Sequence, residues 1–584
     1  IDKLKAKILD GSVEFIGSGY SQIIAPLVPC KINRANLKMG MKVYEELLGV
    51  RPEIWLINEM AYSGGLPGLY AEAGISALVM EWNNTWKGHP QWDPELRYHH
   101  QIALGNDGSK LPVLWIDTLD FQKFQRLAHD DMPLENWADG WTNRADETAE
   151  KNRFATYYGS DAEVFDFRPG RYSHERTPGS SSEWQRIGTA LDSLTSHPNL
   201  QYCTLGAALK EKPSGVCGLA LKLECTEQPV IVKKQEKYNL NRWAVTGRQD
   251  LEANTACHIL AENIQDSATN EQWRHLLFLW SSDFRTHITQ QRWNKFKTEG
   301  HLPSPREFIS SPTDGEPTQI KNDQRILALE TATVKAVLDM RRGLALGSLS
   351  FPQLGDTPVL GTLPHGHFDD ISFGADFYSG HSVVQRPGHR KLTDLKPCAP
   401  STTTQRLKNG NLVARTEISD HELTISKEVE IHCDEPRISL KGRLDLPSRY
   451  AGEIHPLHLT IIPGFFQEEH LEFRTHNGGR DLEVFPLTET SVHHGASYST
   501  LITSKGGLGS TEGVVEIGDG KHSLVITHDT CVSALIPTVR FEKVRGGGYF
   551  LRLRYSAQEI DETFVENDAP WQVQWSVSIE ARVD

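Results

Sequence analysis

Short apolar runs alternate with amphipathic segments along residues 1–175. Runs of four or five apolar residues predict buried strands, and apolar residues spaced three and four apart predict helices, as in Leu37–Leu48. Alternation of strands and helices is typical of a parallel sheet with crossover helices. The predicted strands are Val13–Gly17, Ile54–Ile57, Ser76–Met80, Pro112–Ile116 and Phe154–Tyr158.

The pattern changes twice further along the chain. Residues 181–334 are predicted to be mainly helical, over Trp184–Leu194, Asp250–Asn263 and Asn270–Phe296. After residue 334, short alternating runs separated by Gly, Pro, Asn and Asp predict an antiparallel β-sandwich. We therefore expect a multidomain α/β plus all-β protein with domains at 1–180, 181–334 and 335–584.

Acidic residues follow four of the predicted strands. Because the carboxyl ends of parallel strands meet at one edge of a sheet, these carboxylates are expected to line a polar pocket there. Each one alone could instead cap a helix or stabilise a turn. The four residues are Glu59, Glu81, Asp117 and Asp161.

Composition narrows the range of partners. The net charge of −15 argues against nucleic acid, which requires clustered Lys and Arg. No apolar run approaches the roughly 20 residues of a membrane helix. The eight cysteines are scattered without a CxxC pair, which fits reduced thiols in a cytoplasmic, bacterial protein. No metal and no cofactor are expected. The 14 tryptophans suit a sugar-binding cleft or an ordinary core.

Paired carboxylates on neighbouring strands favour glycoside cleavage. One carboxyl group protonates the leaving oxygen, and the other attacks the sugar or activates water. Glu59 follows an apolar strand, whereas Asp161 lies in a segment rich in aromatic, acidic and basic residues. Such different surroundings separate the pKa values of two acids and so their roles.

Four segments resemble the motifs of glycoside hydrolase family 57. Residues 11–27 are similar to its second motif, and Trp55-Leu-Ile-Asn-Glu-Met-Ala61 is similar to the third. Asp161-Ala-Glu-Val-Phe165 and Trp280-Ser-Ser-Asp-Phe-Arg285 are similar to the fourth and fifth. The resemblance implies a retaining enzyme acting on α-linked glycans, with Glu59 as nucleophile and Asp161 as acid/base. It also implies an incomplete (β/α)7 barrel, a helical segment that completes the active site and a β-rich C-terminal region.

The chain departs from this family in two places. The first motif, His-Gln-Pro, has no counterpart, and five strands are predicted where the family has seven. We therefore expect about two N-terminal strands to be absent or supplied by a separate fragment, with a homo-oligomer as another possibility. The usual His of the second motif is Gln22 here.

The substrate-binding candidates come from these motifs and from the strand ends. Acidic candidates bind sugar hydroxyls or form salt bridges, tryptophans stack on sugars or fill the core, and arginines orient a carboxylate or bind an anionic sugar. Glu163 and Asp166 are alternatives to Asp161 as the acid, and Trp184 is a further stacking candidate. The substrate-binding candidates are Gln22, Trp55, Glu81, Trp82, Asp117, Glu163, Arg168, Trp280, Asp283 and Arg285.

A second polar cluster lies in the predicted β region. His365, His367, Asp369 and Asp370 precede Asp376 and His381. His-x-His with nearby aspartates can bind a metal, but a polar loop is the favoured interpretation.

Other functions remain open. A glycan transferase of the 4-α-glucanotransferase or branching type would use the same groups. A metal-dependent α-mannosidase or deacetylase would require histidines at strand ends, and a carbohydrate-binding protein would keep the fold without turnover. In each case the partner is an oligo- or polysaccharide.

Overall fold

A computed structural model describes most of the chain, in two compact units. The described residues are 1–148, 152–166, 182–210, 216–234, 237–286, 289–307, 318–319, 325–364, 378–488, 491–544 and 547–583. The first unit contains residues 1–18, 40–60 and 70–223. The second unit contains residues 19–39, 61–69 and 224–584. The long helix α2, Cys30–Leu48, contributes residues to both.

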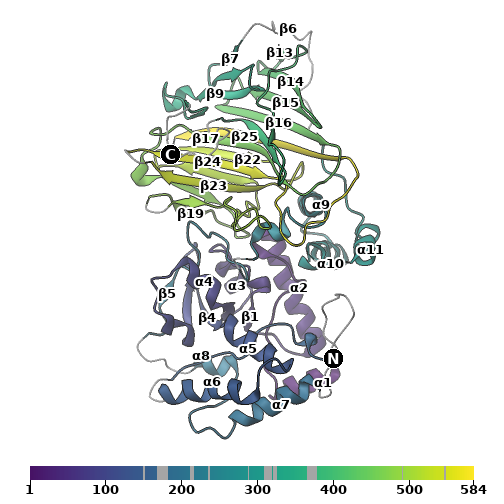
Figure 1. Ribbon diagram of the computed structural model, residues 1–584, viewed down its shortest axis with the longest axis vertical. Helices are drawn as coiled ribbons and strands as arrows, with labels where there is room; N and C mark the ends of the chain where they lie inside the picture. Colours follow the sequence, from purple (N-terminus) through teal and green to yellow (C-terminus); the bar gives the residue numbers. More distant parts are fainter. Residues whose placement is uncertain are drawn as a thin grey trace. The chain divides into compact units, whose positions relative to one another are not determined.

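The first unit is built on a sheet of five described strands in the order β1-β2-β4-β3-β5 (Figure 1). β1, β2 and β4 are parallel neighbours, while β3 pairs antiparallel with β4. The strands are β1 Ile54–Leu56, β2 Ala77–Glu81, β3 Gln101–Leu104, β4 Lys110–Ile116 and β5 Ala220–Leu221. The seven-stranded barrel is therefore not established, although the mixed α/β character is confirmed.

Helices connect and cover these strands. Phe124, Trp137, Phe165 and Ile187 form an apolar cluster between the helices α5, α6 and α7. The helices are α1 Asp2–Leu9, α3 Pro67–Glu72, α4 Trp82–Gly88, α5 Thr118–Ala128, α6 Leu134–Glu147, α7 Glu183–Leu194 and α8 Leu205–Lys210.

Two predicted strands of this unit are wrong. Val13–Gly17 makes a single bridge, from Gly17 to Trp55. Phe154–Tyr158 has no strand assignment: the Phe154 amide donates to the Tyr98 carbonyl (2.9 Å), and the Thr156 hydroxyl donates to the Trp115 carbonyl (3.2 Å). An apolar, aromatic run can thus lie against a sheet by side-chain packing without forming a ladder.

The second unit begins with helices. Asp250–Asn263 is the helix α9, as predicted, but the predicted helix over Asn270–Phe296 is two helices, α10 Asn270–Leu279 and α11 Gln290–Gly300. The side chains of Ser281 and Thr289 accept hydrogen bonds from backbone amides of the turns that follow them, so each begins a new helical turn. These capping residues explain the break.

Two large antiparallel sheets make up the rest of this unit, and they confirm the predicted β region. The first runs β20-β23-β24-β17-β10-β9-β8-β7, with β11 beside β17 and β12 beside β11. Its strands are β7 Ile326–Glu330, β8 Lys335–Asp339, β9 Ala345–Ser350, β10 Leu360–Gly361, β11 His381–Gln385, β12 Leu392–Thr393, β17 Glu453–Ile461, β20 Val492–His493, β23 Ile536–Lys543 and β24 Tyr549–Ser556.

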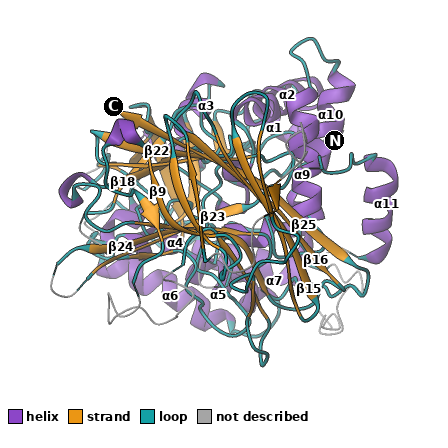
Figure 2. Ribbon diagram, turned by 90° about the horizontal axis from the view of Figure 1, so that it is seen from above, coloured by secondary structure: helices purple, strands orange, loops and turns teal. Residues whose placement is uncertain are grey.

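The second sheet runs β19-β18-β21-β22-β25-β16-β15-β14-β13-β6. Strands β15, β16 and β25 are hydrogen-bonded neighbours, and they lie side by side in Figure 2. The strands are β6 Thr318–Gln319, β13 Thr403–Arg406, β14 Leu412–Asp420, β15 Leu423–Ile431, β16 Arg437–Leu446, β18 Glu472–Thr475, β19 Glu483–Pro486, β21 Val514–Gly518, β22 His522–His528 and β25 Trp571–Val583.

One apolar core serves both large sheets. Leu459 and Leu553 from the first sheet belong to the same buried cluster as Val577 and Ile579 from the second. Successive side chains of a strand point to opposite faces of its sheet. These four residues therefore lie on the faces of the two sheets that meet in the shared core.

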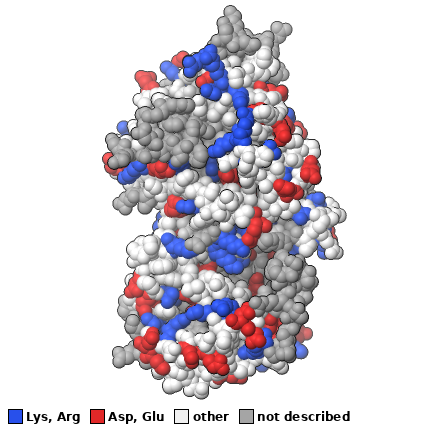
Figure 3. All heavy atoms as spheres, in the orientation of Figure 1, with Lys and Arg blue, Asp and Glu red and all other residues white. Residues whose placement is uncertain are grey.

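Basic and acidic side chains both appear on the face drawn in Figure 3. No helix in the described part of the chain combines the length and the apolarity that crossing a bilayer requires.

Candidate active site

Three parallel strands of the first unit end at one edge of its sheet. The register places Leu56 opposite Val79, and Val79 opposite Leu114. Glu81 ends β2, and Glu59 and Asp117 come after β1 and β4. Three of the four predicted acidic strand ends therefore gather at this edge, where α/β enzymes place their functional groups.

Glu59 has a backbone conformation that is rare for its residue type. Its φ is 53° and its ψ is 15°, and the next residue, Met60, has a φ of 52°. The left-handed region costs a residue with a Cβ roughly 1–2 kcal/mol. Such strain persists only where the surroundings impose it, and it is concentrated at functional sites. The Glu59 side chain is half-buried.

The other two carboxylates of this edge have structural partners. Glu81 is buried and accepts a hydrogen bond from the Asn84 side chain. Asp117 caps helix α5 by accepting from the Leu119 amide (2.8 Å), and it pairs with Arg97 (3.2 Å). Their positions are thus explained by capping and pairing, which leaves Glu59 as the acid of this edge with an unusual backbone.

Asp161 is exposed and immediately precedes a turn of 3-10 helix, Ala162–Val164. The Tyr158 hydroxyl donates to the Asp161 carbonyl at 2.6 Å, which fixes the backbone there. Asp166 instead accepts from the Glu183 amide (2.8 Å) and from Ser182, so it caps helix α7. Arg168 and the side chain of Glu163 lie outside the described residues.

A cavity of about 450 Å³ opens beside this segment. Residues Tyr157–Ser160 line it directly before Asp161, and Tyr98, Trp115 and Phe154 supply further aromatic walls. This volume lies within the range of small-molecule sites, which are mostly apolar with a few polar groups. The cavity can therefore accommodate part of a ligand next to Asp161.

Arginines that sequence analysis did not select sit in this cavity wall. Arg153 forms an ion pair with Glu95, and the guanidinium groups of Arg97 and Arg153 lie 4.7 and 4.6 Å from the Tyr98 ring centre. No sequence signal links Arg153 to its partners, because Tyr98 lies 55 positions and Glu95 58 positions before it.

The tryptophan candidates of the first unit differ in exposure. Trp55 is buried, and its ring packs so closely on Gly17 that a Cβ there would lie 2.3 Å from a ring carbon. Trp82 is buried against Trp115, with ring centres 5.3 Å apart. Trp184 is half exposed, so it is the one of these three rings with a surface that can meet a ligand.

The candidates of the second unit are mostly tied into its core. Arg285 is 2% exposed and donates to the Asn254 side chain (3.0 Å) and to backbone carbonyls, and Trp280 is buried. Asp283 is exposed and pairs with Arg292 (3.0 Å). Gln22 is exposed, and its carbonyl accepts from the Ser282 amide (2.7 Å).

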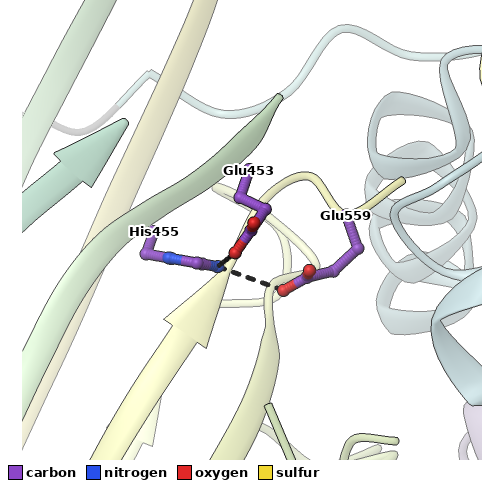
Figure 4. Close-up of side chains that lie close together, drawn as sticks. All are labelled: Glu453, His455 and Glu559. Carbon is purple, nitrogen blue, oxygen red and sulfur yellow. Dashed lines mark hydrogen bonds and ion pairs between the residues drawn. The ribbon is translucent and has the colours of Figure 1, made fainter. Parts of the chain in front are cut away.

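Metal-binding capacity lies elsewhere. Among the described residues, the group of side chains that could hold an ion is Glu453, His455 and Glu559, in the second unit (Figure 4). The sequence cluster of His365, His367, Asp369, Asp370 and Asp376 lies outside the described residues. His381 is buried in β11 and stacks on His458, with ring centres 4.5 Å apart.

The N-terminal part of the chain, which includes residues of both units, matches a known family of glycoside-active enzymes. Residues 1–161 match the model of glycosyl hydrolase family 57. This match confirms the resemblance seen in the motifs and the prediction of an enzyme that acts on glycosidic bonds. No curated protein matches the chain significantly.

Several solved structures resemble the whole chain at low identity. An α-mannosidase from Enterococcus faecalis V583 is 9% identical, with a TM-score of 0.56 over 100% of this chain and 80% of that one. A glycosyl hydrolase family 38 protein from Enterococcus faecalis is 8% identical, with a TM-score of 0.50 over 100% and 78%. The 4-α-glucanotransferase from Thermococcus litoralis is 12% identical, with a TM-score of 0.39 over 100% and 89%. At such identities the first two likenesses describe the fold alone.

Proposed function

We propose that the protein is a retaining glycoside hydrolase of α-linked glycans, with Glu59 as nucleophile and Asp161 as acid/base. The observation that carries the proposal is the position of Glu59, held in a left-handed backbone conformation directly after a parallel strand. The family match over residues 1–161 includes both residues. Neither Glu81 nor Asp117 competes well for these roles, because both are engaged in local structure.

In the first step, Asp161 donates its proton to the glycosidic oxygen while a Glu59 oxygen attacks the anomeric carbon. The bond to the leaving sugar breaks, and a glycosyl ester forms on Glu59. In the second step, the Asp161 carboxylate takes a proton from water, which attacks the same carbon and releases Glu59. Two inversions retain the configuration at the anomeric carbon.

The exposure of Asp161 fits a group that exchanges its proton with an incoming acceptor. The acceptor of the second step can also be a sugar hydroxyl, which gives transfer in place of hydrolysis. The aromatic cavity beside Tyr157–Ser160 would hold the leaving or accepting group, since aromatic faces suit the apolar faces of sugars.

The proposal is tested with maltooligosaccharides and the Glu59→Gln variant. We expect kcat/KM to fall by at least about 10³-fold, because the amide cannot form the ester. Azide should restore turnover of an activated glycoside and give a glycosyl azide of inverted configuration. Glu53→Gln is the matched control, since Glu53 is exposed at the opposite end of the same strand. Activity of Glu59→Gln near that of Glu53→Gln would refute the nucleophile assignment.

A metal-dependent mechanism is the competing outcome. The likeness to the α-mannosidase is one of fold, and no metal-capable group of described residues lies at the sheet edge of Glu59. Activity lost on chelation and restored by zinc would favour that mechanism and overturn the proposal.

A further inference from the structure

The cavity beside Tyr157–Ser160 lies on one face of the α/β sheet. Leu56, Val79 and Leu114 line it, and the register places these three residues side by side on β1, β2 and β4. Residues directly opposite in adjacent strands share a face, so the sheet itself forms one wall. Protein interiors contain few voids larger than a water molecule, whereas this cavity has a volume of about 450 Å³. A cavity of this size is typical of a ligand site.

The cavity is accessible from solvent along residues 201–204. These four residues line it, and all of them are exposed. The ring of Tyr202 lies edge-on to the ring of Tyr157, with ring centres 6.1 Å apart. The Tyr202 hydroxyl donates to the Leu191 carbonyl (2.8 Å), which holds the ring in this position. A ligand can therefore enter past an aromatic ring that the chain has already placed.

The lining offers little that could bind the hydroxyls of a sugar. Among the described residues that form it, none is Asp, Glu or Asn, and Gln201 is the one carboxamide. The hydroxyls of Thr156, Tyr158 and Tyr202 already donate to backbone carbonyls. A hydroxyl that is buried without a partner costs roughly 1–3 kcal/mol, and a sugar carries several. The lining therefore favours a ligand that is largely apolar.

The two arginines of the lining are paired within the chain. Arg97 forms an ion pair with Asp117 (3.2 Å), and Arg153 forms one with Glu95. Both guanidinium groups also lie over the ring of Tyr98, at 4.7 and 4.6 Å from its centre. Because these charges are compensated by carboxylates, the cavity favours a neutral ligand over an anionic one.

The remaining walls suit a flat aromatic ligand. Most of the lining residues are aliphatic or aromatic, and Trp141, Phe154 and Tyr157 are among the aromatic ones. Aromatic rings pack favourably edge-to-face or offset against one another. An apolar cavity of about 150 Å³ is enough to bind benzene, so the larger volume here has room for two fused rings.

The cavity adjoins both proposed catalytic residues. Leu56 in its wall lies three residues before Glu59, and Ser160 lies directly before Asp161. The hydroxyl of Tyr158, another wall residue, donates to the Asp161 carbonyl (2.6 Å). An occupant would thus lie beside the group that protonates the leaving oxygen.

We propose that this cavity binds a neutral aromatic aglycone, so that the preferred substrates are α-glycosides with an aromatic leaving group. The assignment rests on the proposed function, because the aglycone is the group that receives the Asp161 proton. The apolar sheet face and the aromatic walls bind the aglycone rings, and the glycosidic oxygen is directed toward Asp161.

Binding is measured by calorimetry on the full chain at pH 7, with 2-naphthol as the probe and glucose as the polar comparison. We expect saturable binding of 2-naphthol at one site. Tyr202→Ala should weaken it about fivefold or more, because an aromatic contact is lost, whereas Tyr202→Phe keeps the ring and should bind as the wild type does. Tyr498→Ala is the matched control, since Tyr498 in the second unit is 41% exposed and Tyr202 is 43% exposed.

Alkylation of a cysteine locates the bound probe. Cys203 lines the cavity and is exposed. Saturating 2-naphthol should slow the reaction of Cys203 with iodoacetamide several-fold and leave that of Cys433, in the second unit, unchanged. Mass spectrometry of the digested protein measures both. Unchanged alkylation of Cys203 would place the probe elsewhere and overturn the proposal.

Turnover tests the role of the cavity as a leaving-group site. The substrates are phenyl and 2-naphthyl α-maltosides, whose leaving groups have similar acidity. The kcat/KM of the naphthyl compound should be about fivefold higher or more, mainly through KM, because only its second ring fills the cavity. Tyr202→Ala should remove this preference, and Tyr202→Phe should keep it.

The outcomes separate this proposal from the proposed function. Turnover of maltooligosaccharides without saturable 2-naphthol binding overturns the aromatic site alone, as does 2-naphthol binding that Tyr202→Ala leaves unchanged. Glucose that displaces 2-naphthol with comparable affinity would make the cavity a sugar site and also overturns it. Binding of 2-naphthol without turnover of any α-glycoside overturns the proposed function and, with it, the role of the bound ring as an aglycone.

Discussion

The two units use charge on their sheets in opposite ways. At the edge of β1, β2 and β4, acidic side chains follow strand ends, where turns and helix starts supply backbone amides, as Leu119 does for Asp117. In the first large sheet of the second unit, basic side chains such as Arg554 on β24 lie within strands, where backbone groups are already used by the ladder. Their partners come from other side chains, as Glu559 does for Arg554 (3.4 Å). Charge at a strand end is therefore satisfied locally, whereas charge inside a buried strand depends on tertiary contacts.

The largest expected effect separates the two regions by function. Glu59→Gln should abolish turnover, by at least about 10³-fold, and leave the free energy of unfolding nearly unchanged. Arg554→Gln should lower the free energy of unfolding by about 1.5–3 kcal/mol, the range of hydrogen bonds to charged groups, and leave kcat/KM unchanged. Measuring both quantities on both variants, by kinetics and urea denaturation, tests this independence. If either substitution changes both quantities, the two regions form one functional system.

A smaller loss is expected for the proposed acid. Asp161→Asn should lower kcat/KM on a natural glycan by about 10²–10⁴-fold, the range of general acid catalysis. The loss should be much smaller for an aryl glycoside whose leaving group needs no proton. Asp192→Asn, an exposed substitution on α7, is the control. A larger loss in Glu163→Gln than in Asp161→Asn would move the acid role to Glu163.

Acid should destabilise the second unit in particular. Burial is the largest cause that lowers the pKa of six of its histidines: His455, His494 and His528 to about 4, and His258, His381 and His493 to about 3. Since the ordinary value is 6.5, the unfolded chain takes up protons first as the pH falls. Stability is then fully present above about pH 6.5 and is lost toward pH 4.

Each histidine contributes at most about 1.4 kcal/mol per pH unit across this window. Glu453, whose pKa is raised to about 7, makes one contribution of the opposite sign, because a raised carboxyl pKa favours the folded state as the pH falls. Calorimetric melting should show similar temperatures at pH 8 and 7 and a clearly lower one at pH 5. Equal melting temperatures at pH 7 and pH 5 would contradict the burial of neutral histidines in this unit.

The smallest expected effects concern packing. Gly442 lies opposite Trp575 across β16 and β25, and a Cβ at this position would lie 2.1 Å from a ring carbon. Gly442→Ala should destabilise the second unit by about 1–3 kcal/mol, as overpacked cores do. Gly140→Ala is the comparison: this exposed position in α6 has no atom within 4 Å of the new Cβ, and the change should stabilise the helix by about 0.5–1 kcal/mol. Urea denaturation measures both, and equal effects would contradict the packing argument.

Local patterns predicted much of the α/β sheet. The apolar runs of β1, β2 and β4 are buried on both faces, so their residues are continuous in sequence and easily recognised. Strand β3, Gln101–Leu104, was missed because it is short and begins with glutamine, whose amide is satisfied by distant carbonyls such as that of Val216. Its place in the sheet depends on tertiary contacts.

The same difference applies to the sites. Glu59 could be selected because a strand end and a motif surround it in sequence. The aromatic cavity could not be, because its walls come from segments as far apart in the sequence as Ile16 and Ala208. Only the folded sheet and its connections bring these segments together. The partner of Asp117, Arg97, was likewise beyond local patterns.

The backbone of Glu59 has a consequence for how this sequence could drift. Glycine or asparagine at position 59 would adopt the left-handed conformation with less strain, so either change would make the folded chain easier to form. In related proteins that do not need this carboxylate, we expect glycine or asparagine to replace the glutamate. With the nucleophile role proposed for Glu59, a glutamate at this position gives up some folding stability to keep a reactive carboxylate there.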